Sequence, residues 1–111
     1  LQAQKKSWKE MDDFHTVMGA TFHPAEENNL QPLKQKAGDL ILKAKDWQQS
    51  TVPDGFNGDV TKPILKKLVK QCKIIQRSVN RSKTDEVLKT QITTAHDIFH
   101  EIMEKCRDEK H

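Results

Sequence analysis

Residues 61–80 read TKPILKKLVKQCKIIQRSVN, and this stretch decides the fold class. Its apolar residues fall three or four positions apart, as on one face of an α-helix, and form a heptad-like seam: Leu65, Leu68, Cys72, Ile75 and Val79. Thr61, with Pro63 just behind it, is typical of a helix start. The stretch therefore predicts an amphipathic helix that packs one side against other helices.

Helical spacing recurs in the segments on either side. The first segment places six residues on one stripe, which Pro24 is expected to end: Trp8, Met11, Phe14, His15, Met18 and Phe22. The second is expected to start near Asn29 to Pro32 and has its own inner face: Leu33, Ala37, Leu40, Ile41, Ala44 and Trp47. The last follows a capping-box pattern at Ser82 and Asp85 and carries a third stripe: Leu88, Ile92, Ala95, Phe99, Met103 and Cys106.

The connections between these segments are short and rich in turn-forming residues, such as Val52-Pro53-Asp54-Gly55. Short loops force neighbouring helices to run antiparallel. We therefore predict an all-α fold, an antiparallel up-down-up-down four-helix bundle that forms one domain over residues 1–111. The predicted helices cover roughly residues 5–23, 30–50, 61–80 and 83–108.

Composition excludes several classes of protein. Charged residues make up 32% of the chain and no apolar run approaches the length of a membrane span, so we expect no membrane span. The net charge of +3 comes from 19 basic and 16 acidic residues, which we interpret as mixed along the chain, and we expect no nucleic-acid partner. The chain begins at Leu1 rather than methionine, from which we expect a protein that is periplasmic or otherwise exported.

The two cysteines are predicted to stay unpaired. Counted outward from the turn near residue 82, Cys72 and Cys106 differ in height by about 21 Å along antiparallel helices. A disulfide tolerates a Cα separation of only about 7 Å. We expect Cys72 to be a small core residue and Cys106 to be either a core residue or an exposed thiol.

The histidines are the candidate metal ligands. His96 and His100 stand four residues apart, so both imidazoles leave the same side of a helix and can chelate one ion. His15 falls within the apolar stripe of the first helix, where a buried imidazole needs a hydrogen-bond partner or a ligand role. His23 is the weakest candidate, because it closes the first helix at the end predicted to lie away from His100 and could cap carbonyl groups. His111 is the last residue, and its position predicts no function.

The order of segments resembles the cytochrome c-prime and soluble cytochrome b group of four-helix bundles. In c-prime proteins the last helix carries Cys-x-x-Cys-His followed by an acidic residue and an aromatic; Ala95-His96-Asp97-Ile98-Phe99 has a similar setting, without the two cysteines. The resemblance therefore implies no covalent haem. The resemblance is still compatible with a noncovalent b-type haem, bound by Met11 with His96 or His100 in a pocket walled by Trp8 and Trp47.

Three functions remain open from the sequence. The first is a histidine-liganded site for zinc, copper or nickel that serves binding, sensing or trafficking. Asp97 and Glu101 would either be solvated or orient the imidazoles of His96 and His100. The second is noncovalent haem binding with electron transfer. The third is a cofactor-free structural or partner-binding bundle. We expect no enzyme, because the sequence has no Ser-His-Asp order, glycine-rich phosphate loop or His-Glu-x-x-His signature.

Overall fold

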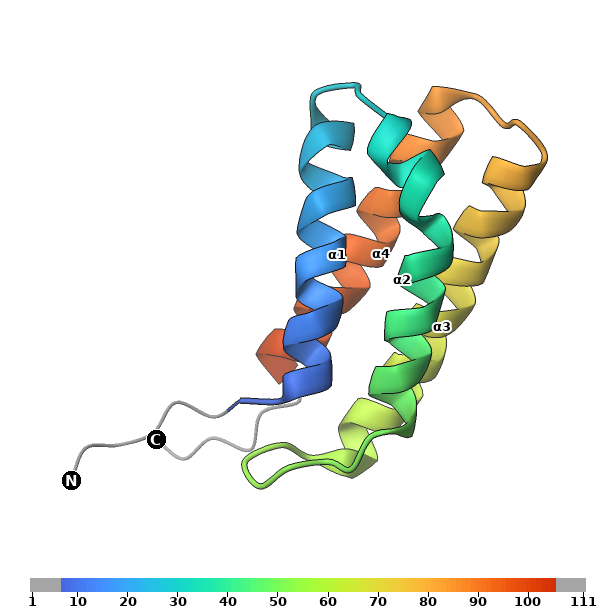
Figure 1. Ribbon diagram of the computed structural model, residues 1–111. Helices are drawn as coiled ribbons and strands as arrows, with labels where there is room; N and C mark the ends of the chain where they lie inside the picture. The colour runs from blue at the N-terminus through green and yellow to red at the C-terminus, as the bar shows by residue number, and fades with distance from the viewer. Residues whose placement is uncertain (1–6, 106–111) are drawn as a thin grey trace.

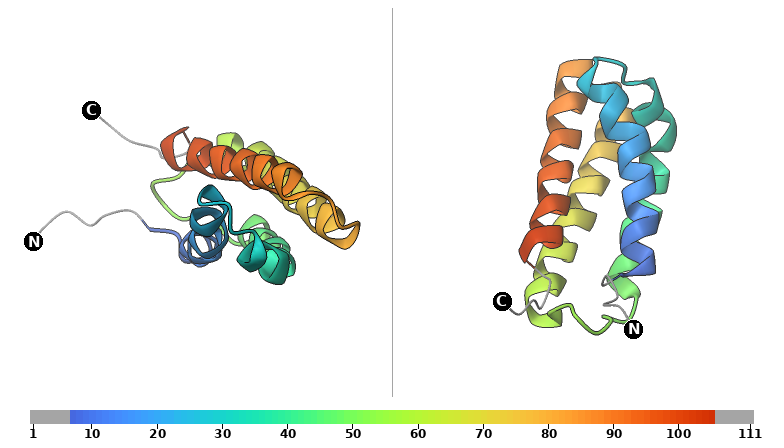
Figure 2. Two further views of the ribbon diagram at one scale, coloured as in Figure 1. Left: turned by 90° about the horizontal axis from the view of Figure 1, so that it is seen from above. Right: turned by 90° about the vertical axis from the view of Figure 1, so that its left-hand side faces the viewer.

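The computed structural model describes residues 7–105, which form four helices and no strand (Figures 1 and 2): α1 (Lys9–Glu26), α2 (Gln31–Gln49), α3 (Gly58–Asn80) and α4 (Asp85–Lys105). Successive helices run in opposite directions, and each packs against the next. α1 also packs against α4, over a smaller interface, so α1 and α3 stand diagonally opposite each other. The prediction of an all-α antiparallel four-helix bundle is confirmed.

Two predicted helix ends are wrong because proline is tolerated inside both helices. α1 continues through Pro24 to Glu26, and α3 begins at Gly58, five residues before Pro63. A proline inside a helix removes one backbone N–H and crowds the carbonyl four residues earlier. At Pro24 this affects only the last turn, which still buries Ala25 in the core. Near a helix end, packing thus outweighs the loss of one hydrogen bond.

Side-chain caps differ from the predicted ones in both later helices. The Asn57 side chain accepts hydrogen bonds from the backbone N–H groups of Asp59 and Val60, at 3.0 and 3.2 Å, and so begins α3. The predicted Ser82–Asp85 capping box is absent. Ser82 lies in the loop with φ of 53°, and the Thr84 hydroxyl accepts instead from the Val87 N–H at 3.3 Å. The helix start therefore lies two residues later than the pattern indicated.

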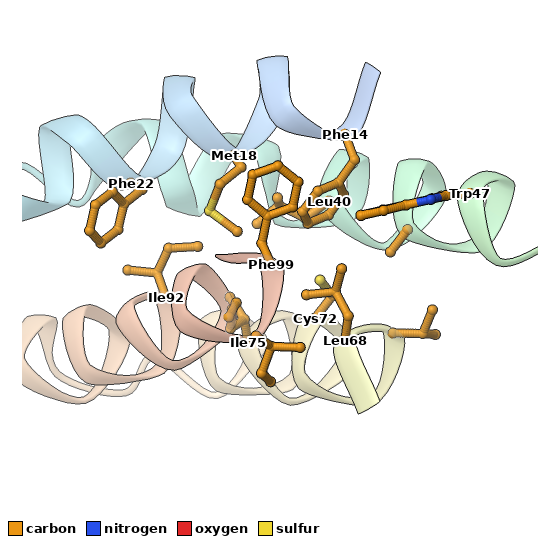
Figure 3. Packing of buried hydrophobic residues seen from close by; sticks show 14 of the residues in the cluster. Phe14, Met18, Phe22, Leu40, Trp47, Leu68, Cys72, Ile75, Ile92 and Phe99 are labelled. Carbon is orange, nitrogen blue, oxygen red and sulfur yellow. The ribbon is translucent and has the colours of Figure 1, made fainter. Parts of the chain in front are cut away.

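The core contains a cluster of aromatic rings towards the end of the bundle where the α2–α3 loop lies. Phe14, Trp47 and Phe99 contact one another with ring centroids 5.6–5.8 Å apart, and all three are buried (Figure 3). Trp8 packs edge-on against Trp47 at 5.9 Å, and its indole N–H donates to the Ser50 hydroxyl at 2.8 Å. Each ring buries a large apolar area, so this cluster contributes much of the folding free energy.

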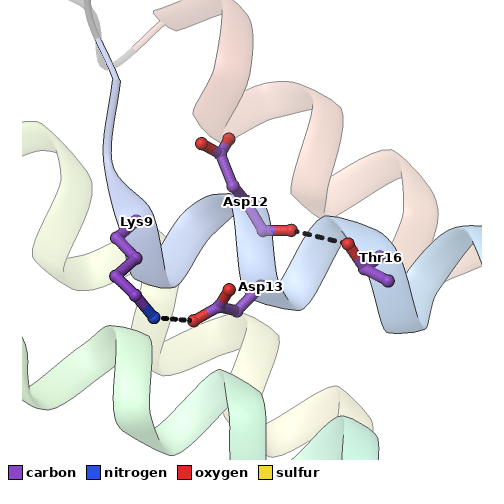
Figure 4. A network of polar contacts seen from close by, with 4 residues as sticks. All are labelled: Lys9, Asp12, Asp13 and Thr16. Carbon is purple, nitrogen blue, oxygen red and sulfur yellow. Dashed lines mark hydrogen bonds and ion pairs between the residues drawn. The ribbon is translucent and has the colours of Figure 1, made fainter.

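The exposed side of α1 carries a local polar network (Figure 4). Lys9 Nζ lies 2.9 Å from Asp13 Oδ2, and the Thr16 hydroxyl donates to the Asp12 carbonyl at 3.2 Å. The hydrogen bond to Asp13 raises the pKa of Lys9. A hollow of about 370 Å³ lies beside it between α1 and α2, lined by residues of both charges and by no histidine. Among the described helices none is both long and apolar enough to cross a membrane.

Candidate metal centre

Four histidines gather where α1 meets α4, and we call this group the histidine seam: His15 and His23 on α1, and His96 and His100 on α4. Two buried aromatic residues lie among them. Phe22 of α1 contacts His23 and His96, and Phe99 of α4 contacts His15 and His100. The seam thus follows the smallest helix interface of the bundle.

His96 is the most enclosed of the four imidazoles. Its ring is half-buried and stacks face to face on Phe22, with centroids 3.8 Å apart and planes 8° from parallel. Burial lowers the pKa of His96, and the charge of His100 lowers it further, while Asp97 acts in the opposite direction. The neutral form, which is the form that binds metal ions, is therefore favoured at neutral pH.

His100 lies beside His96, as the four-residue spacing predicts. The two ring centroids are 4.4 Å apart with a 58° angle between the planes. His100 is exposed, and its Nδ1 lies 3.9 Å from a Glu104 carboxylate oxygen. The structure thus places two adjacent imidazoles on one helix face, one half-buried and one open to solvent.

His23 and Glu26 approach this pair from α1. Their side chains lie 3.6 Å apart, and the charges of both act on the pKa of His96 across the interface. A Cβ atom placed on Gly19 would be 3.6 Å from the His23 ring, so the imidazole leans back along its own helix. His23 thus lies in the last turn of α1, as predicted, and its charge still reaches His96.

His15 is exposed, and the prediction that it lies on the buried stripe is wrong. The buried residues of α1 include Met11, Phe14, Met18 and Phe22. His15 is the residue after Phe14 and lies on the side of α1 that faces α4. Its ring contacts Phe99 with centroids 5.0 Å apart. Because solvent satisfies its polar atoms, His15 needs neither a buried hydrogen-bond partner nor a ligand.

No group of three or more His, Cys, Asp or Glu side chains within residues 7–105 is arranged to hold a metal ion. The pair His96 and His100 is brought together, but His15 does not join it in a three-donor set. The electrostatic setting is nevertheless favourable to cations, since α1 and α4 together contain nine acidic and only three lysine residues.

The helix register weighs against Met11 and His96 as two ligands of one haem iron. Phe22 stacks on His96, and Met11 precedes Phe22 by eleven residues, a rise of about 16 Å along α1. Trp8 and Trp47 do lie at one end of the bundle, as predicted, but they pack directly on each other. The two tryptophans that the resemblance assigns to the walls of a haem pocket are thus buried and in contact with each other.

Cys72 is confirmed as a core residue. Its thiol is unpaired and buried, and burial raises its pKa to about 12. A thiol held protonated in this way is a poor nucleophile at neutral pH. Cys106 and His111 lie outside the described residues.

The sequence does not predict that Phe22 and Glu26 lie beside the histidine seam. The residue pattern places Phe22 only in the core stripe, and its contact with the His96 ring depends on the packing of α1 against α4. No protein-family model, curated protein or solved structure shows significant similarity to this chain. The resemblance to the c-prime and soluble cytochrome b group therefore stays a prediction.

Proposed function

We propose that this bundle binds a divalent transition-metal ion, zinc, copper or nickel, at the histidine seam. The observation that carries the proposal is the adjacency of the His96 and His100 imidazoles, 4.4 Å apart at the smallest helix interface. Imidazole nitrogens are preferred ligands for all three of these metals. Binding, sensing and trafficking of such ions are the roles that this site supports.

His96 and His100 are the primary ligands in this proposal. The His23 imidazole or the Glu26 carboxylate supplies a third donor after rotation of its side chain, because the stacking of Phe22 on His96 brings this end of α1 against the pair. Water completes the coordination shell. Stacking on Phe22 fixes the plane of the His96 ring, which reduces the conformational entropy lost when the ion binds.

Calorimetric titration of the metal-free protein with zinc, copper and nickel tests this proposal. Loss of even an outer hydrogen-bond partner of a ligand costs about 10- to 100-fold in affinity, so His96→Gln and His100→Gln should each weaken binding at least about tenfold. His15→Gln is the matched control, because it removes an imidazole from the same seam without touching the pair. Affinity should also fall as the pH drops below about 6.5, where imidazoles become protonated.

Saturable binding lost in both α4 variants and retained in the control supports the site. If the unsubstituted protein shows no saturable heat with any of the three ions, the proposal fails and the cofactor-free bundle is favoured. Equal weakening by His15→Gln and His96→Gln would also refute it, because binding would then depend on the number of histidines rather than on the pair. Circular dichroism of each variant checks that the helices are intact.

A further inference from the structure

Basic residues are concentrated on α3, which corrects the interpretation that charges are mixed along the chain. α3 contains six basic residues and a single acidic one, Asp59. Five of the basic residues follow one another at intervals of four, four, three and four, and we call them the basic stripe: Lys62, Lys66, Lys70, Lys73 and Arg77. At 1.5 Å per residue the stripe extends about 22 Å along the helix.

The basic stripe has no acidic partner within the described part of the chain. All five residues are exposed, and none forms an ion pair with a carboxylate of residues 7–105. Lys67, which lies off the stripe towards α4, does pair with Glu101 at 3.5 Å. Among the described residues the stripe is therefore a row of like charges that an external anion can neutralise.

A shallow groove between α2 and α3 opens beside the stripe. It has a volume of about 360 Å³ and is lined by Lys66, Val69, Lys70 and Lys73 of α3 with Gln48 of α2. No acidic side chain lines it. Because α3 is diagonal to α1, the stripe faces away from the acidic first helix. The bundle thus has a basic long side centred on α3.

We propose that the basic stripe docks the bundle, lying along its long axis, on an anionic phospholipid membrane. The apolar face of α3 is already buried against α2 and α4, so the contact is electrostatic and peripheral rather than an insertion. A lysine close to the surface of an anionic membrane contributes about 1 kcal/mol of binding free energy. A straight row of five cations on a bundle 49 Å long can meet such a surface together.

The side chains of this face fit lipid headgroups better than nucleic acid. Single-stranded nucleic acids are usually bound by aromatic rings that stack on bases, and every tryptophan and phenylalanine within residues 7–105 is buried. Four of the five stripe residues are lysines, which act as flexible point charges, whereas arginine supplies the bidentate fork that recognises individual phosphates and guanines. A fluid layer of anionic lipid headgroups attracts positive charges and requires no fixed hydrogen-bond pairing with them.

Sedimentation with lipid vesicles tests the docking. The full chain is mixed at low salt with vesicles of phosphatidylcholine alone, or of two parts phosphatidylcholine to one part phosphatidylglycerol. Lys66→Gln with Lys70→Gln removes two stripe charges, and Lys36→Gln with Lys43→Gln removes two charges from α2 as the matched control. At about 1 kcal/mol per lysine, the stripe variant should bind anionic vesicles about thirtyfold more weakly than the unsubstituted chain, and the control should bind within about threefold of it.

Binding that needs phosphatidylglycerol, falls with added salt and is lost in the stripe variant alone supports the proposal. It is overturned if the unsubstituted chain stays unbound on anionic vesicles at low salt, or if the two double variants lose binding equally. Tighter binding to duplex DNA than to anionic vesicles at the same salt concentration would also overturn it, in favour of nucleic acid. All four lysines lie outside the histidine seam, so metal titration of the stripe variant separates this result from the proposed metal binding.

Discussion

Replacing Phe99 by alanine should remove a large share of the stability of the bundle. The Phe99 ring is 1% exposed and contacts Phe14 at 5.6 Å and Trp47 at 5.8 Å, so it lies within the aromatic cluster of the core. Truncating a buried phenylalanine to alanine costs about 3–5 kcal/mol, because transfer free energy is lost and a cavity is left. Domains of this size are stable by only about 5–15 kcal/mol.

A loss of about 4 kcal/mol corresponds to a fall in Tm of roughly 20 °C for about 100 residues. Urea unfolding followed by circular dichroism measures the free energy directly, and Val87→Ala, at an exposed position of the same helix, is the control. The control should change the stability by no more than about 0.5 kcal/mol. If both variants unfold at the same urea concentration, the aromatic cluster does not stabilise the fold in the way that its packing indicates.

Two further perturbations test the site and a helix cap. The pKa of His96 is lowered in the folded state, so the unfolded chain binds this proton at a higher pH, and the free energy of unfolding should decrease as the pH falls below about 6.5. Urea unfolding at a series of pH values should show a smaller decrease in His96→Gln, and an unchanged slope would contradict the inferred burial. Asn57→Ala removes the acceptor of two N–H groups at the start of α3 and should cost about 1 kcal/mol in thermal or urea unfolding. Asn57→Asp keeps an acceptor and should cost little, and equal losses in both variants would show that the side-chain cap contributes nothing.

The sequence predicts the fold well because apolar periodicity is a local property. Apart from His15, the seam of Leu65 to Val79 and the stripe residues of the other three segments that lie within residues 7–105 are buried or half-buried in the bundle. Helix ends were predicted less well at Pro24 and Pro63, since tertiary packing decides whether a proline stops a helix. Ser82 adopts a left-handed backbone in the loop, which a pattern of residue types does not reveal.

The candidate site was predicted only in part. The spacing of His96 and His100 sets their distance on one helix, and the structure bears this out. The sequence places His15 wrongly because the apolar stripe combines three- and four-residue spacings. At His15 this stripe departs from the buried face by a fraction of a helical turn. The stacking of Phe22 on His96 depends on how α1 lies against α4, which the residue pattern of neither helix encodes.

The placement of the two tryptophans determines what optical measurements on this protein report. Trp8 and Trp47 contact each other at the α2–α3 loop end, whereas the stacked Phe22 and His96 lie further along the bundle. Intrinsic tryptophan fluorescence therefore reports unfolding at the α2–α3 loop end and does not report fraying of the helices at the other end. Far-UV circular dichroism averages over all four helices, so coincident fluorescence and dichroism transitions would indicate that both ends of the bundle unfold as one cooperative unit.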